Sequence, residues 1–284
     1  MKQKKIILRS LRESFSVIRK NKRIVLSLLI LQLILFSLMF FVNIKYQSKM
    51  LESTQAIIEY MEKQKFDQAS LGLSLLQQKS VLGDDPLLIS RNFSAIAYNL
   101  KFLIFYTLII FILLNGFIWF LTCNLINKNF KSLKINIKNL FNYIFKFGLI
   151  ALIFSFLAYL IAFSTLESSL NPFEETQKSS FAPLLLVPVL FYFMYLAFPL
   201  LNKVQFKNIL KNLFNLGIKK AHIVLLADLL TILIISVFSF LLFYLAEQNI
   251  FLVFVSTILL TLSFVWSRIF LALVVDKLNN YSEA

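Results

Sequence analysis

The chain of 284 residues is 59% hydrophobic, has a mean hydropathy of +0.78 and carries a formal net charge of +15. These values exclude an ordinary soluble domain and indicate a protein that crosses a membrane. The single cysteine, Cys123, excludes an internal disulfide and a cysteine metal cluster, and the single histidine, His222, excludes a multi-histidine metal site.

The positive charge is compatible with two partners, nucleic acid or the membrane itself. The basic residues lie beside apolar stretches rather than in a separate soluble segment. Lysine and arginine beside a membrane span are attracted to anionic lipid head groups by about 1 kcal/mol each. We therefore expect the lipid bilayer and its anionic head groups as partners, and no nucleic acid.

Six stretches are long enough to span a membrane, because a spanning helix needs about 20 mainly apolar residues. They cover roughly residues 24–44, 102–123, 147–164, 182–201, 221–245 and 251–275. The expected fold class is therefore all-α: a polytopic membrane protein with six transmembrane helices arranged as three hairpins.

Charges in the connecting segments predict the orientation. Residues 1–23 carry nine basic side chains and one acidic one, and segments 124–146 and 202–220 each carry five lysines and no acidic residue. The alternate segment 165–181 has three acidic residues and one lysine. Because basic loops stay on the cytoplasmic side, we expect an integral protein of a prokaryotic cell membrane with both termini in the cytoplasm.

One phrase of five residues occurs twice. Residues 138–142 recur letter for letter as 211–215, an offset of 73 residues, and a fainter copy opens the chain around Phe15. Each copy lies in a basic, amphipathic stretch before a long apolar run, which is typical of a helix in the head-group layer. The sequence thus predicts one unit used three times: an interfacial helix followed by a membrane hairpin. Alternatively, the basic stretches are cytoplasmic extensions of the spans, although a break at Gly217 favours a bend in the third copy.

Basic side chains of these three stretches are the predicted contacts to lipid head groups. They are Arg12, Arg19, Lys20, Lys134, Lys138, Lys146, Lys207, Lys211 and Lys219.

Four segments are expected along the chain. Residues 1–23 form the first interfacial helix, and 24–123 form the first hairpin, with an outer helical loop at 45–101. Residues 124–201 hold the second interfacial helix and hairpin. Residues 202–284 hold the third, followed by a short cytoplasmic tail.

Two opposite charges lie inside the last two spans. Asp228 and Arg268 are each twenty positions from Gln248, in the turn between these spans. At a rise of about 1.5 Å per residue they lie at the same depth. Because a lone charge inside a membrane is costly, we predict an ion pair between them. The pair has two open roles: a structural lock, or a functional site for an ion, a proton or a lipid phosphate on Arg268.

Two further residues are candidates for a cavity. Asn115 is a polar residue within the second span, and Pro188 lies within the fourth. A proline inside a helix removes a backbone donor and kinks the helix, which can open a cavity or merely reflect packing.

The segment from Phe191 through Tyr195, Pro199 and Lys207 to Ile223 resembles a pattern in six-span proteins of the YciC-like group and of the DUF4013 and DUF975 types. It is also similar to the membrane domain of some glycerophosphodiester phosphodiesterases. In these families a span that ends near proline leads to a basic helix and then to another span. The resemblance implies a membrane-embedded protein, and no catalytic residue carries over from it.

Three hypotheses for the function follow. The first is a non-enzymatic scaffold or lipid-interacting component of the cell envelope, and the second is a transporter or permease subunit for a small solute or lipid. An intramembrane enzyme is the third, but no nucleotide, zinc-protease or serine-hydrolase motif is present, so we expect no catalytic residue, metal or cofactor. Whether the chain forms a homo-oligomer or binds another membrane protein is left open by the sequence.

Overall fold

The computed structural model describes residues 2–63, 85, 87–126, 137–169, 182–245 and 247–280. Every regular element within these ranges is a helix. Six of these helices are long and apolar enough to cross a membrane, in agreement with the sequence prediction. They are Lys22–Lys63, Leu87–Ile126, Ile137–Ala162, Pro183–Leu200, Ala221–Leu245 and Ile250–Asn279.

The chain divides into two compact units. The first unit combines residues 1–33 with 112–284, and the second contains residues 34–111. Helix α2 (Lys22–Lys63) contributes to both units, and α4 (Leu87–Ile110) belongs to the second.

Helix α2 is much longer than the predicted first span, 24–44. Its 42 residues continue without interruption to Lys63, which at about 1.5 Å per residue gives about 63 Å. The sequence between 22 and 63 contains no glycine or proline, so nothing ends the helix where the apolar run stops. The predicted outer loop at 45–101 therefore starts as a continuation of α2, and its last part, from Leu87, belongs to α4, while residues 64–84 lie outside the described ones.

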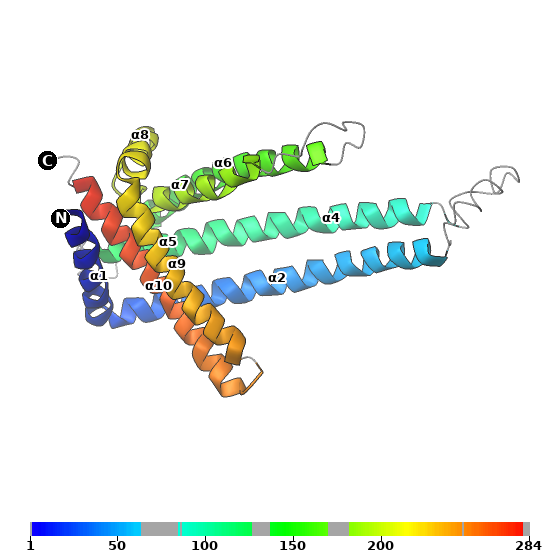
Figure 1. Cartoon of the computed structure of the whole chain (residues 1–284), viewed down its shortest axis with the longest axis horizontal. Helices are drawn as coiled ribbons and strands as arrows, with labels where there is room; N and C mark the ends of the chain where they lie inside the picture. Colours follow the sequence, from blue (N-terminus) through cyan, green and yellow to red (C-terminus); the bar gives the residue numbers. More distant parts are fainter. Residues whose placement is uncertain are drawn as a thin grey trace, which may run out of the picture. The chain divides into compact units, whose positions relative to one another are not determined.

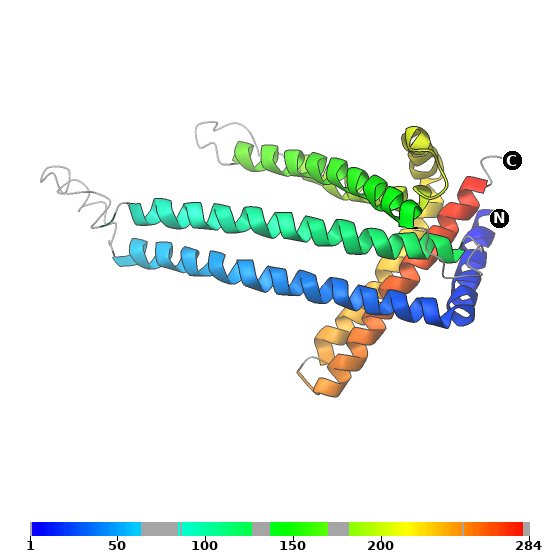
Figure 2. The same cartoon turned by 180° about the vertical axis from the view of Figure 1, so that it is seen from behind.

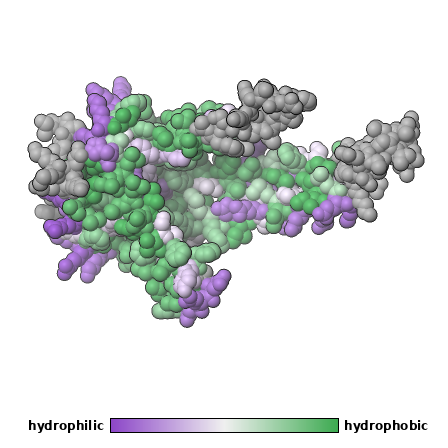
Figure 3. Space-filling model, viewed as in Figure 1, coloured by the Kyte–Doolittle hydropathy of each residue, from purple (hydrophilic) through white to green (hydrophobic). Residues whose placement is uncertain are grey.

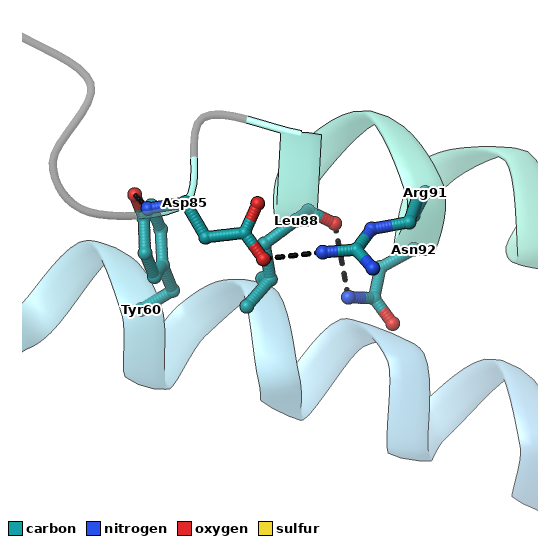
Figure 4. A network of polar contacts seen from close by, with 5 residues as sticks. All are labelled: Tyr60, Asp85, Leu88, Arg91 and Asn92. Carbon is teal, nitrogen blue, oxygen red and sulfur yellow. Dashed lines mark hydrogen bonds and ion pairs between the residues drawn. The ribbon is translucent and has the colours of Figure 1, made fainter.

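Within the second unit, aromatic rings join α2 to α4. The Tyr46 ring stacks on Phe102 and Tyr106, with ring centroids 6.4 and 5.9 Å apart. At the far end of α2, the Asp85 backbone N–H donates to the Tyr60 hydroxyl, and the Asp85 carboxylate pairs with Arg91 (Figure 4). These contacts join α2 to α4 near the middle of α2 and again at its C-terminal end.

Helix α10 (Ile250–Asn280) is the core of the first unit. Helices α1 (Lys2–Lys20), α5 (Gly116–Ile126), α7 (Leu186–Leu200) and α9 (Ala221–Leu245) all pack against it. Every residue of α10 from Val265 to Val275 is buried. A helix buried on all sides is apolar all round, so any charge in this stretch must find its partners inside the protein.

Two antiparallel helix pairs are visible in both views of the molecule. Helix α9 lies along α10, and α6 (Ile137–Ser169) lies along α7 (Figures 1 and 2). Hydrophobic side chains cover the visible sides of α9 and α10, and hydrophilic ones gather at the turn between them (Figure 3). This distribution is typical of helices surrounded by lipid tails, with their connection in the head-group layer or in water.

The described part of the second basic stretch differs from the predicted interfacial helix. Residues 137–145 are the first turns of α6, which continues without interruption to Ser169. The alternative interpretation, a cytoplasmic extension of the span, therefore fits this part. Lys134 lies outside the described residues.

The third basic stretch forms elements separate from the following span. A 3-10 turn (Phe206–Asn208), α8 (Ile209–Phe214) and a π-helical turn (Asn215–Lys219) precede α9. The break falls at Lys220, whose φ of −113° and ψ of 19° leave the helical region, and not at the predicted Gly217. Gly217 has a different role, because a Cβ there would lie 2.5 Å from Cε1 of Phe193 on α7.

Pro188 does not kink the fourth span. Helix α7 begins at Leu186, after a 3-10 turn at Ala182–Leu185, so Pro188 lies in the first helical turn. The backbone N–H groups of a first turn have no partner within the helix, and a missing one costs little. The proline inside the helix is Pro199, one residue from its end.

Helix α1 is fixed on α10 by three side-chain contacts. The Trp266 Nε1–H donates to Ser14 Oγ at 3.0 Å, and the Phe15 ring stacks on Trp266 with centroids 6.0 Å apart. The Glu13 carboxylate lies 2.7 Å from Lys277 Nζ and 3.1 Å from Arg9 Nε. Burial alone would raise the pKa of Glu13, but Lys277 and Arg9 outweigh it and hold this pKa below its ordinary value.

The docking of α1 should weaken in acid. Because the folded pKa of Glu13 is depressed, its stabilising effect is complete above the ordinary value of 4.5 and is lost as the pH falls through the lower folded pKa. We expect Trp266 fluorescence, which reports on Ser14 and Phe15, to change over this range. The Glu13→Gln variant should lack the transition; identical pH profiles for both proteins would contradict this role of Glu13.

Candidate functional site

The most unusual residue of the core is Arg268, a charged side chain that is only 7% exposed. Its Nη1 donates a hydrogen bond to Oε1 of Gln32, from the part of α2 that belongs to the first unit. The Tyr195 hydroxyl on α7 also lies close enough to Arg268 to interact with it electrostatically. Three helices, α2, α7 and α10, thus converge on one guanidinium.

The structure gives Arg268 a partner other than the predicted one. The ion pairs among the described residues join Arg9 and Lys277 to Glu13, Arg91 to Asp85 and Lys203 to Asp276, and none joins Asp228 to Arg268. Counting residues from a turn gives the depth of a side chain, but the packing of the helix decides the direction in which it points. Arg268 points to α2, where the amide oxygen of Gln32 accepts its hydrogen bond.

Asp228 nevertheless lies close to this centre. Its side chain is half-buried on α9, and its charge acts on the hydroxyls of both Tyr192 and Tyr195. Tyr195 interacts with Arg268 as well. The two charges therefore lie around the same tyrosine without direct contact.

Two buried polar atoms near Tyr195 have no hydrogen-bond partner among the described residues. They are Nε1 of Trp119 and Oδ1 of Asn115. The Trp119 ring meets Tyr195 edge-on, with centroids 5.3 Å apart, and Asn115 lies one helical turn before Trp119, on the same side. Asn115 is 5% exposed whereas Pro188 is exposed, so the structure gives no support to the predicted cavity shared by these two residues.

We define the polar centre as Gln32, Trp119, Tyr195, Asp228 and Arg268. Buried charges are normally paired, because desolvation makes an isolated ion expensive. Here the guanidinium donates to a neutral amide, and Asp228 is half-buried on α9, where its charge acts on Tyr195. Such an arrangement can hold an anion on Arg268 and Tyr195, or exchange a proton or cation at Asp228.

Three members of the polar centre were missed by the sequence interpretation: Gln32, Trp119 and Tyr195. One signal was present, because Gln32 is the only polar side chain between Leu28 and Phe36. Interhelical hydrogen bonds commonly involve such isolated glutamines and asparagines in membrane spans. Tyrosine and tryptophan carry no such signal, because both are also common as packing residues.

A second candidate site is the basic face formed by the three related stretches. The phenylalanine that they share is exposed in each copy: Phe15 by 58%, Phe141 by 69% and Phe214 by 65%. The residue four positions before it is also exposed in two copies, at 66% for Ile137 and 69% for Leu210. Lys138 and Lys211 follow these residues directly and are exposed, so apolar and basic side chains are exposed next to one another in these two stretches.

Two lysines, one shortly after the end of α7 and one directly before α9, contact the C-terminal end of α10. Lys203 pairs with Asp276, and Lys220 Nζ donates to the Leu278 carbonyl oxygen at 2.7 Å. A lysine at a helix C-terminus satisfies a carbonyl that lacks a partner within the helix and complements the helix dipole. Burial lowers the pKa of Lys220. Among the described residues, no group of three histidine, cysteine or acidic side chains could hold a metal ion.

Comparison with protein-family models, with curated proteins and with solved structures gives no match. The resemblance to the YciC-like, DUF4013-type and DUF975-type proteins therefore stays a prediction.

Replacement of Gln32 should destabilise the protein more than replacement of Asp228. In Gln32→Leu the buried guanidinium loses an acceptor, and a hydrogen bond to a charged group contributes about 1.5–3 kcal/mol. Asp228→Asn removes a carboxylate that has no direct basic partner, so its effect should be small. The thermal unfolding temperature in detergent measures both effects. A larger decrease for Asp228→Asn than for Gln32→Leu would contradict this expectation and support the predicted ion pair instead.

Proposed function

We propose that this chain is a non-enzymatic, lipid-interacting protein of the cell envelope, integral to the membrane and with both termini in the cytoplasm. In this proposal its three basic stretches lie at the cytoplasmic head-group layer, each leading into a membrane hairpin. The observation that carries the proposal is the matching exposure of Phe15, Phe141 and Phe214 at equivalent positions of the repeated phrase.

The burial of the neighbouring residues supports one orientation for the first and third copies. Ser10 and Ser14 in the first copy, and Ile209 and Leu213 in the third, occupy equivalent positions and are at most 2% exposed. The same side of each stretch thus packs on the protein while the shared phenylalanine faces outward. An aromatic ring flanked by basic residues suits the boundary between lipid tails and anionic head groups.

Loss of lysines from the basic face should weaken the preference for anionic lipid. We expect the triple variant Lys138→Gln, Lys207→Gln, Lys211→Gln to retain less phosphatidylglycerol relative to phosphatidylcholine after purification from mixed micelles, because each lysine contributes about 1 kcal/mol. The lipid ratio bound to the purified protein is measured by mass spectrometry.

The matched control removes the same charge from the second unit, by glutamine at Lys45, Lys49 and Lys101, all of which are exposed. This control should keep the phosphatidylglycerol preference of the parent protein. An equal fall in both triple variants would assign the preference to net charge and refute a specific basic face.

A transporter or permease subunit is the second candidate function. It is favoured by the polar centre, in which a buried Arg268 has neutral partners and Asp228 lies half-buried beside Tyr195. Charged residues inside membrane spans commonly mark the pathway of a substrate or ion. Gln32 and Tyr195, which interact with Arg268, come from two other helices, α2 and α7, so a ligand that displaced Gln32 would act on their packing.

The transport hypothesis predicts that Asp228→Asn and Arg268→Gln each abolish uptake while the purified variants remain folded. Flux of small anions, cations and protons into proteoliposomes is the measurement, with the exposed, nearby His222→Gln as control. Unchanged flux in both folded variants for every solute that the parent protein transports would exclude the polar centre as a transport site.

A further inference from the structure

An apolar groove of about 500 Å³ lies in the first unit where α1 meets α9 and α10. Its volume falls within the range of about 300–1,000 Å³ that is common for ligand sites. Side chains from all three helices form its walls: Phe15 and Ile18; Ile234, Val237 and Phe238; Leu259, Leu262, Ser263 and Trp266.

The groove is suited to hydrocarbon. No charged side chain lines it. Its one hydroxyl, Ser263 Oγ, already donates to the Leu260 carbonyl oxygen at 2.7 Å. A water molecule in this groove would find few hydrogen-bond partners, so apolar atoms are the favoured occupants.

Trp266 gives the groove a rigid end. Its Nε1–H donates to Ser14, and its ring stacks on Phe15 and on Phe270, at 6.0 and 5.2 Å between centroids. The opposite wall is open, because Val237 is 56% exposed. The groove therefore begins at α1 and continues along the lipid-facing side of the α9–α10 pair.

Positive charge borders the end of the groove at α1. Arg12 and Arg19 lie three residues before and four residues after Phe15, and so on the same side of the helix. Both are exposed, and neither takes part in an ion pair among the described residues. An apolar groove that ends beside two such arginines matches a molecule with a hydrocarbon chain and an anionic head.

We propose that this groove binds one acyl chain of an anionic phospholipid, whose phosphate head group lies on Arg12 and Arg19. The proposal rests on the lipid-interacting function proposed above and assigns to it a specific lipid class and site. The bound lipid would join α1 to the α9–α10 pair, because its chain contacts all three helices.

Trp266 offers a direct test, because bromine atoms on an acyl chain quench a nearby tryptophan. The full chain is placed in phosphatidylcholine nanodiscs with increasing fractions of phosphatidylglycerol or phosphatidylcholine brominated in the chain. The Trp266→Phe variant retains only Trp119, which is 0% exposed. Its fluorescence is subtracted from that of the parent protein to give the Trp266 signal. We expect the Trp266 signal to be half-quenched at a several-fold lower fraction of brominated phosphatidylglycerol than of brominated phosphatidylcholine.

Two double variants show where the preference arises. Arg12→Gln with Arg19→Gln should bring the phosphatidylglycerol curve onto the phosphatidylcholine curve. The same charge loss on α8 and the turn before it, Lys207→Gln with Lys211→Gln, should leave the two curves apart. Both double variants change exposed side chains only, so they should remain folded.

Equal quenching by the two brominated lipids in the parent protein, or no quenching of Trp266, would overturn the proposal. A second copy or another protein that covers the groove would also prevent quenching. If the purified protein still retains phosphatidylglycerol selectively, the proposed function stands and only this site is refuted. If that selectivity is absent too, both proposals fail.

Discussion

The cost of placing charge in an apolar medium governs this structure. Helix α10 is buried on all sides from Val265 to Val275, and Arg268 lies within that stretch. Because an unpaired guanidinium there would be strongly unfavourable, Gln32 on α2 and Tyr195 on α7 must be held against it. The arginine therefore fixes which side of α2 and of α7 faces α10. Apolar packing alone would define the rotation of these two helices less strictly.

The same cost places the other charges at the ends of the helices. Lys203, Lys220 and Lys277 lie around the end of α10, where they contact Asp276, the Leu278 carbonyl oxygen and Glu13. These bonds attach α1, the residues after α7 and the segment before α9 to the same end of α10. Phe15 and Phe214, at equivalent positions of α1 and of the segment before α9, whose sequences are related, are both exposed. Membrane anchoring and lipid selection, in the proposed function, thus use side chains that are mainly exposed.

Sequence periodicity and apolar runs predicted the six long helices, and they placed the ends of the last two spans close to those of α9 and α10. The end of α2 could not be predicted from hydropathy, because helix formation continues past Ile44 until a residue interrupts it. The partner of Arg268 could not be predicted either, since residue counting gives depth but not rotation about the helix axis. Pro188 shows the same limit, because its effect depends on where α7 begins.

In the proposed function, three related basic stretches hold their shared phenylalanine at one membrane boundary. Spin labels on cysteines placed singly at positions 15, 141 and 214 measure this through their collision rates with oxygen and with a water-soluble nickel complex in liposomes; Cys123 is buried and should not be labelled. The account predicts equal, shallow depths on the same side of the membrane. Labels on opposite sides, or depths that differ by more than one helical turn, about 5.4 Å, would contradict it.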